Sequence, residues 1–130
     1  MSVAYVDTSA LVAIAFDECG AEALAAYLTG FTRLVSSNLL EAELRAACHR
    51  EGLPVPDHLL ARINWVLTHR PLSPEMETAL GAGHLRGTDL WHIATALYVA
   101  PEPASIAFVT LDQRQAEVAA ALGFQGPRRA

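Results

Sequence analysis

Two short apolar segments of this chain each run directly into an aspartate. The first, Val3–Val6, is followed by Asp7, and the second, residues 106–111, is followed by Asp112. Sequence typical of a helix follows each aspartate, and strands that alternate with helices predict a parallel sheet covered on both faces. Ligands of such sheets bind beyond the carboxyl ends of the strands. The pattern therefore predicts an α/β fold with two carboxylates at one edge of its sheet.

The rest of the chain continues this alternation. We expect strands at 3–6, 33–36, 70–72 and 105–110, and helices at 9–16, 20–30, 37–52, 57–67, 73–85, 88–99 and 113–122. In the third helix, Asn38 is the expected N-cap, Glu41 its capping-box partner and Gly52 the C-terminal stop. We find no repeat and no linker, so we expect a single domain over residues 1–130.

Composition limits the class of protein. Apolar residues make up 52% of the 130 residues and charged residues 18%, which favours a packed globule over disorder. The apolar stretches are far shorter than the ~20 residues of a membrane helix, and no secretory signal pattern precedes the first strand. We therefore expect a cytosolic protein without a membrane partner. Cys19 and Cys48 match no metal or redox motif, so we expect them to be inert.

Two glutamates of the third helix are predicted to point in different directions. At about 100° per residue, Glu43 falls in the middle of the apolar stripe, whereas Glu41 lies nearly opposite, beside Arg45 at i+4. Capping and a surface ion pair explain Glu41. A carboxylate that faces the core is costly unless it is paired or binds a metal. For Glu43 the pairing alternative is Arg50, two helical turns away.

Asp89 is predicted to lead the inward-facing stripe of the helix at 88–99. It could be a helix cap there, as Asp7 and Asp112 could be for their own helices. Together with Glu43, these acids would repel one another unless a cation joined them, and oxygen ligands favour Mg²⁺ or Mn²⁺ over zinc. Removing these four from the fourteen acids leaves ten against nine basic residues, so most of the net charge of −5 belongs to the proposed site.

Four segments resemble, in order, the successive motifs of PIN-domain ribonucleases, and most closely those of VapC-type toxins: YVDTSAL, SSNLLEAELRAA, LRGTDLWHIATAL and FVTLDQR with AAALGF. The resemblance covers nearly the whole chain. It implies a PIN-like three-layer α/β/α sandwich with a small, mostly parallel sheet of four to five strands. It also implies a Mg²⁺- or Mn²⁺-dependent endoribonuclease, the toxin of a type II toxin–antitoxin pair that restrains translation and growth. A cognate antitoxin and a homodimer are further implications.

Motif by motif, the catalytic and metal-binding acids of the family correspond to Asp7, Glu43, Asp89 and Asp112, the same four that spacing indicates. Residues 52–72 carry no family motif. Trp91, in the segment DLWH, stands where a small residue is more usual in the family, which affects the expected shape of the pocket.

Thr110 takes the threonine position of the last motif, and Arg86 and Arg114 flank two of the acids. These three residues are candidates for binding the RNA substrate. All nine basic residues are arginine, which suits bidentate contacts with phosphate. His92 could orient a site carboxylate or could be an ordinary core histidine.

The expected chemistry is hydrolysis of a phosphodiester bond by water, with divalent ions held by the carboxylates. A phosphoryl-transfer domain of the receiver or phosphatase type would use a lysine, and the chain has none. A non-catalytic PIN-like module that binds RNA or protein remains the alternative. The expected antitoxin is small, with a basic C-terminal segment that reaches the acidic pocket and a helix lying between residues 21–28 and 37–47.

Overall fold

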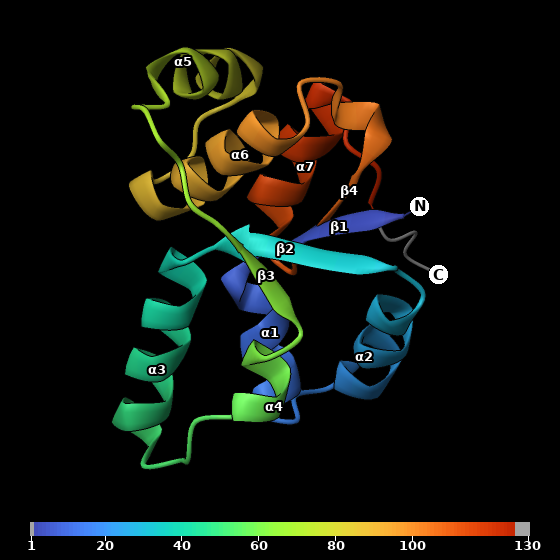
Figure 1. Ribbon diagram of the computed structural model, residues 1–130, viewed down its shortest axis with the longest axis vertical. Helices are drawn as coiled ribbons and strands as arrows, with labels where there is room; N and C mark the ends of the chain where they lie inside the picture. Colours follow the sequence, from blue (N-terminus) through green and yellow to red (C-terminus); the bar gives the residue numbers. More distant parts are fainter. Residues whose placement is uncertain (1, 127–130) are drawn as a thin grey trace.

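The computed structural model describes residues 2–126 and contains a four-stranded sheet. Its strands are β1 (Val3–Val6), β2 (Arg33–Ser37), β3 (Ile63–Val66) and β4 (Ala107–Val109). They lie side by side in the order β3-β2-β1-β4, and each neighbouring pair is parallel. The carboxyl ends of all the strands therefore lie at one edge of the sheet (Figure 1). The predicted parallel sheet is confirmed.

Helices cover both faces of this sheet. Within residues 2–126 they are α1 (Thr8–Ala15), α2 (Ala21–Thr29), α3 (Leu39–Glu51), α4 (Asp57–Leu60), α5 (Ser73–Ala82), α6 (Gly87–Val99) and α7 (Gln113–Leu122), with a 3₁₀ turn at Pro103–Ser105. Figure 1 shows α1 to α4 on one side of the sheet and α5 to α7 on the other. This arrangement confirms the three-layer α/β/α sandwich.

Alternation of side chains along β1 divides the core into two layers. Ala4 and Val6 pack among α1 to α4, whereas Tyr5 packs among α5 to α7. In the second layer the ring of Tyr5 stacks on Phe108 of β4, with 5.2 Å between the ring centroids. Burial on both faces explains why β1 reads as an uninterrupted apolar run.

The beginnings of three helices show how the edge of the sheet is built. Asp7 caps α1 by accepting a hydrogen bond from the backbone of Ser9, and Asp112 caps α7 in the same way. Asn38 is the N-cap of α3, as predicted, but the predicted capping box is wrong: the side chain of Asn38 makes no capping hydrogen bond, and Ser37 Oγ accepts from the backbone of Leu39, 3.1 Å away. The side chain of Asn38 instead donates to Glu41 Oε1. The C-terminal stop of α3 at Gly52 is as predicted, with φ of 66°.

Between α3 and α5 a helix begins at Asp57 as predicted, but the rest of the segment differs from the prediction. The helix expected over 57–67 ends at Leu60, and Ile63–Val66 forms the edge strand β3 instead. Local pattern favoured a helix, but the β-branched and aromatic residues of this segment pair with β2. The side chain of Asn64 adds a hydrogen bond to the carbonyl oxygen of Leu34.

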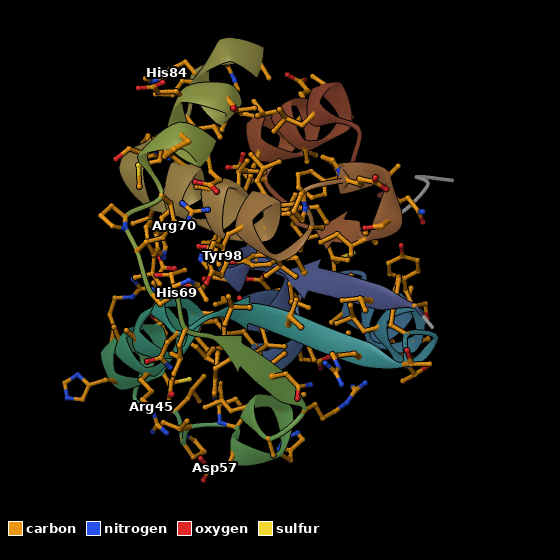
Figure 2. All side chains as sticks on the ribbon, turned by 45° about the horizontal axis from the view of Figure 1, so that its top comes forward. Arg45, Asp57, His69, Arg70, His84 and Tyr98 are labelled. Atoms are coloured by element: carbon orange, nitrogen blue, oxygen red, sulfur yellow. The ribbon has the colours of Figure 1, made fainter. Side chains whose placement is uncertain are left out.

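The strand expected at 70–72 is absent from the described residues because this segment is fixed to α6 rather than to the sheet. The guanidinium of Arg70 lies over the ring of Tyr98, 5.2 Å from its centroid, and pairs with Glu75. His69 Nδ1 and the hydroxyl of Tyr98 form a hydrogen bond. Figure 2 shows His69, Arg70 and Tyr98 gathered where the segment passes α6.

Two further features follow from the fold. No helix within residues 2–126 is long and apolar enough to cross a membrane. Cys19 is exposed and Cys48 is buried, and neither forms a disulfide.

Candidate active site

The carboxyl edge of the sheet gathers three of the predicted acids. Asp7 follows β1, Asp112 follows β4, and Asp89 lies in the first turn of α6. Burial raises the pKa of the Asp89 carboxyl, and the negative charges of Asp7 and Asp112 raise it further. The carboxylate of Asp89 is therefore close enough to Asp7 and Asp112 to be repelled by their charges. Glu43, the fourth predicted acid, lies on α3 and is connected to this group by hydrogen bonds to neighbouring residues.

Asp7 is a buried carboxylate that neutral donors hold in place. Its exposed fraction is 3%. Oδ2 accepts hydrogen bonds from the backbone N–H of Ser9 at 3.0 Å and from its hydroxyl at 2.6 Å. Oδ1 accepts a hydrogen bond from the side-chain amide of Gln115 at 3.1 Å. These donors compensate for lost hydration without a positive charge, which leaves the net charge of Asp7 intact.

Glu43 lies at the border of the buried stripe of α3. The buried residues of that stripe are Leu40, Leu44 and Cys48. The side chain of Glu43 is 32% exposed, so its predicted place in the middle of the stripe is wrong by a fraction of a turn. The alternative pairing with Arg50 is also wrong, because that arginine pairs with Glu51.

Two donors fix the Glu43 carboxylate. The hydroxyl of Thr8 donates to Oε1 at 2.7 Å, and His92 Nε2 lies 3.2 Å from the same oxygen. The hydrogen bond with His92 lowers the pKa of Glu43, Thr8 lowers it further, and partial burial acts in the opposite direction. Glu41, by contrast, forms a surface ion pair with Arg45 at 2.7 Å, as predicted.

His92 links the core to this carboxylate. It is 1% exposed, and its Nδ1 lies 2.7 Å from the hydroxyl of Tyr5. His92 Nε2 faces a carboxylate oxygen of Glu43 at 3.2 Å and lies 3.9 Å from Asp7, and because a carboxylate can only accept, Nε2 carries a hydrogen. In a neutral His92, Nδ1 is then the acceptor of the Tyr5 hydroxyl, which itself accepts a hydrogen bond from the backbone of Ser37. His92 therefore combines both predicted roles: it is a core histidine that orients a site carboxylate.

The other side of the edge is open. A cavity of about 200 Å³ is lined by His84, Leu85, Arg86, Asp89, Asp112 and Arg114. The two arginines are exposed, whereas the two acids are half-buried. This cavity brings both predicted phosphate-binding arginines next to two of the predicted acids. Thr110, the third candidate for substrate binding, is 5% exposed and lies behind Asp7.

Several polar residues at this edge of the sheet were not predicted from the sequence. Thr8 and Ser9 follow Asp7 directly, and small hydroxyl residues beside a strand-end acid are a usable signal for such contacts. The sequence around Tyr5 and Gln115 does not indicate a role at the site, because Tyr5 lies within an apolar strand and Gln115 resembles any polar residue of a helix. Trp91 donates from Nε1 to the hydroxyl of Ser37 at 2.9 Å, so its bulk is fixed against the start of α3.

The donor set is suited to a hard divalent cation, since every predicted ligand is a carboxylate. Besides burial, the charges of Asp7 and Asp112 raise the pKa of Asp89, and a cation would relieve that repulsion. Within residues 2–126, no group of three or more His, Cys, Asp or Glu side chains is arranged to hold a metal ion in the conformation described. The residues thus fit the chemistry of such an ion, but they are not closed into a ligand cage.

Comparisons with known proteins identify the family. A family model described as PIN domain matches residues 4–121. Two relatives named Ribonuclease VapC35, from two strains of Mycobacterium tuberculosis, are each 35% identical over 123 residues, which covers 91% of this chain and 90% of theirs. No solved structure matches the chain significantly. Since the family model and both relatives span nearly the whole fold, the chain belongs to the PIN domain family and is of the VapC type.

Proposed function

We propose that this chain is an endoribonuclease that hydrolyses RNA phosphodiester bonds as the toxin of a type II toxin–antitoxin pair, restraining translation and growth. The observation that carries the proposal is the gathering of Asp7, Asp89 and Asp112 at the carboxyl edge of the sheet, in a chain 35% identical to proteins named ribonuclease VapC35. Keeping like charges together costs free energy. Such a cluster is better explained by a site that meets a cation and a substrate than by fold stability.

The proposed cofactor is Mg²⁺ or Mn²⁺, with Asp7, Glu43, Asp89 and Asp112 as its ligands. When bound, such an ion supplies an activated water and offsets the charge that develops on the phosphate oxygens. The contribution of the chain is to set the direction of the acids. Ser9 fixes the Asp7 carboxylate, while Thr8 and His92 fix that of Glu43.

The substrate is proposed to enter over the open side of the edge. Arg86 and Arg114 line the cavity that Asp89 and Asp112 also line, so their guanidinium groups could hold RNA phosphates beside the acids. Exposed arginines serve this purpose because they can adjust to the backbone of a single strand. The hydroxyl of Thr110 is engaged with buried neighbours, so its predicted contact with substrate stays a prediction.

The proposed partners are RNA, a second copy of the chain and a small antitoxin with a basic C-terminal segment. A basic residue of that segment would pair with the acids of the carboxyl edge. The groove predicted for the antitoxin helix between residues 21–28 and 37–47 stays a prediction, since the open hollow at the start of α2 is lined by no residue of 37–47. The single domain and the cytosolic location also stay predictions.

A cleavage assay with the purified chain tests the proposed function. A mixture of structured and single-stranded RNA is incubated with the protein in Mg²⁺, in Mn²⁺ and in EDTA. We expect internal cleavage with either ion and none in EDTA. Asp112→Asn should abolish that cleavage, and Asp57→Asn, at the exposed start of α4, is the matched control that should not.

Two results would refute the proposal. One is RNA binding without cleavage under every ion condition, which would favour the non-catalytic module. The other is cleavage that survives both EDTA and Asp112→Asn, since this would separate activity from the acids.

A further inference from the structure

Gln115 contacts three of the four predicted acids, although it is not itself a candidate ligand. It lies in the first turn of α7 and has an exposed fraction of 0%. Its side-chain Nε2 donates to Asp7 Oδ1 at 3.1 Å and to the backbone carbonyl of Asp89 at 3.3 Å. Its backbone N–H donates to Asp112 Oδ1 at 2.8 Å. A single residue therefore joins the ends of β1 and β4 to the start of α6.

The amide of Gln115 can take only one orientation. Its Oε1 accepts a hydrogen bond from the hydroxyl of Thr110 at 2.7 Å. Turning the amide over would place its oxygen against the carboxylate of Asp7 and the carbonyl of Asp89, which are both acceptors. The same hydroxyl oxygen of Thr110 also lies 3.2 Å from Asp7 Oδ2, so Thr110 contacts both Gln115 and Asp7.

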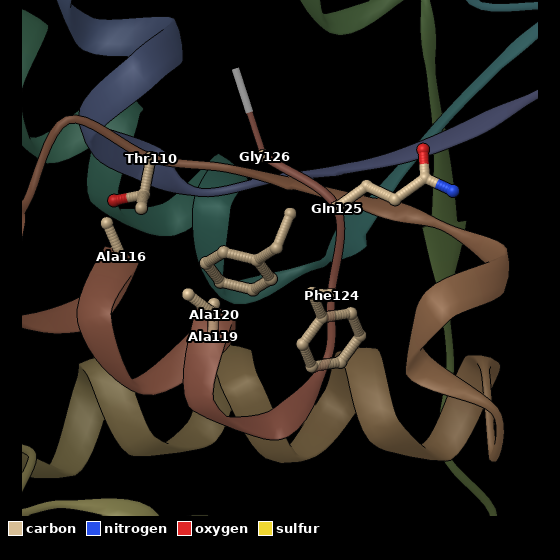
Figure 3. A pocket seen from close by; sticks show the side chains of 8 residues that line it. Thr110, Ala116, Ala119, Ala120, Phe124, Gln125 and Gly126 are labelled. Carbon is tan, nitrogen blue, oxygen red and sulfur yellow. The ribbon is translucent and has the colours of Figure 1, made fainter. Parts of the chain in front are cut away.

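Thr110 and Phe124 both line a cavity of about 170 Å³, and Figure 3 shows the hydroxyl of Thr110 pointing away from the ring of Phe124. The backbone N–H of Asp112 also donates to Thr110 Oγ1, at 3.0 Å. Thr110 is thus a second link that holds Gln115 against the strand end.

The chemistry of an amide explains why a glutamine suits this position. A buried carboxylate needs donors, and a lysine or arginine would supply them together with a positive charge that competes with a cation. The amide of Gln115 fixes the direction of Asp7 and leaves its charge uncompensated. We propose that Gln115 is a positioning residue that holds Asp7, Asp89 and Asp112 in the arrangement required for metal binding and cleavage; this inference rests on the proposed function.

The test replaces Gln115 by methionine, which has similar volume but no amide. Gln113→Met is the matched control, because Gln113 lies two residues earlier on the same helix, is exposed and makes a long 3.4 Å contact with Glu117. Binding of Mn²⁺ is measured by calorimetry without RNA, and cleavage is measured by steady-state kinetics with Mn²⁺.

For Gln115→Met we expect the affinity for Mn²⁺ and kcat each to fall by about 10-fold or more, the scale on which partners of metal ligands act. The KM for RNA should stay within about twofold, since the exposed arginines that face the substrate are unchanged. Gln113→Met should match the wild type in all three quantities.

A folded Gln115→Met protein with wild-type Mn²⁺ affinity and wild-type kcat would overturn the inference, because a merely structural glutamine predicts that result. If this variant does not fold, Thr110→Val replaces it, with Thr110→Ser as the control that keeps the hydroxyl. Loss of Mn²⁺ affinity in the valine variant alone would support the inference, and equal affinities in the two variants would overturn it. A wild-type protein that neither binds Mn²⁺ nor cleaves RNA would instead refute the proposed function.

Discussion

Glu43 and Asp89 are both half-buried acids at the carboxyl edge, yet their pKa values shift in opposite directions. Burial alone would raise the pKa of both. Glu43 lies on the donor-rich side of the edge, formed by Tyr5, Thr8, Glu43 and His92, where two donors hold its charged form.

Asp89 lies on the open side, formed by Arg86, Asp89, Asp112 and Arg114. From residues 2–126 its carboxylate accepts no hydrogen bond, and it faces the charges of Asp7 and Asp112. At Glu43 the hydrogen-bond donors outweigh burial and lower the pKa, whereas at Asp89 burial and the neighbouring charges together raise it. The two acids thus differ in that donors hold the carboxylate of Glu43, whereas within residues 2–126 that of Asp89 has no donor.

The largest expected effect comes from Asp7, where the two sides meet. Asp7→Asn keeps the size of the side chain but removes the charge, so we expect RNA cleavage to fall by at least about 100-fold, the scale of a lost catalytic acid or base. The protein should remain folded by circular dichroism. Cleavage by this variant at the wild-type rate in Mg²⁺ would contradict the proposed active site, because the acid at the centre of the edge would then have no role in cleavage.

The next effect concerns the donor-rich side. Glu43→Gln should lower the affinity for Mn²⁺ by roughly 10-fold, as expected when a ligand of an oxygen site loses its charge. Glu41→Gln is the matched control two residues earlier, and it should leave the affinity unchanged because the side-chain partners of Glu41, Arg45 and Asn38, lie at the surface. Calorimetry that found the reverse pattern would mean that Glu43 is a structural residue.

A third prediction concerns the anchor of the donor-rich side. Tyr5→Phe removes the hydroxyl that serves His92 Nδ1 and the backbone N–H of Ser37, so two buried groups lose a partner. We expect a loss of about 1–3 kcal/mol in the free energy of unfolding, measured by urea denaturation. Tyr27→Phe, a partly buried tyrosine of α2, should cost less. Equal losses in the two variants would contradict the role given to His92.

The smallest effect should be an opposite pH dependence on the two sides. Because the pKa of Asp89 is raised in the folded protein, its charge destabilises the fold at neutral pH. Asp89→Asn should therefore raise the melting temperature at pH 7. This gain should shrink as the pH falls through the raised pKa towards the ordinary value of 3.8.

Glu43 should behave in the reverse sense. Its pKa is lowered in the folded protein, so its charge contributes stability above the ordinary value of 4.5 and loses that contribution as the pH falls through the lowered pKa. Glu43→Gln should then lower the melting temperature at pH 7 but not in strong acid. If the melting temperatures of both variants at pH 7 shifted in the same direction, the opposite effects proposed for the Asp89 and Glu43 charges would be contradicted.

The sequence predicted much of the architecture because local and global signals agree there. The apolar runs that end at Asp7 and Asp112, and the stop at Gly52, each point to the element that forms. The segment between α3 and α5 failed for the opposite reason. Ile63–Val66 becomes a strand only by pairing with β2, a contact that local pattern does not contain.

The candidate site divides in the same way. Its acids were predictable, because a carboxylate at a strand end or beside an apolar stripe breaks the expected pattern. Their supporting residues were not, since Gln115 and Tyr5 acquire their roles only when distant segments meet: Gln115 Nε2 reaches Asp7 across 108 positions of sequence. The partial exposure of Glu43 was also not predicted. Helix geometry gives the direction in which a side chain points, but not how far the neighbouring elements cover it.

The most direct test of the proposed metal site is to grow crystals of the wild-type protein, soak them in Mn²⁺ and locate the ion by anomalous scattering. We predict a peak at the carboxyl edge, bound by carboxylate oxygens of Asp7 and of the open side, Asp89 or Asp112. A saturating soak that gives no peak there, with protein from the same preparation cleaving RNA in Mn²⁺, would contradict it.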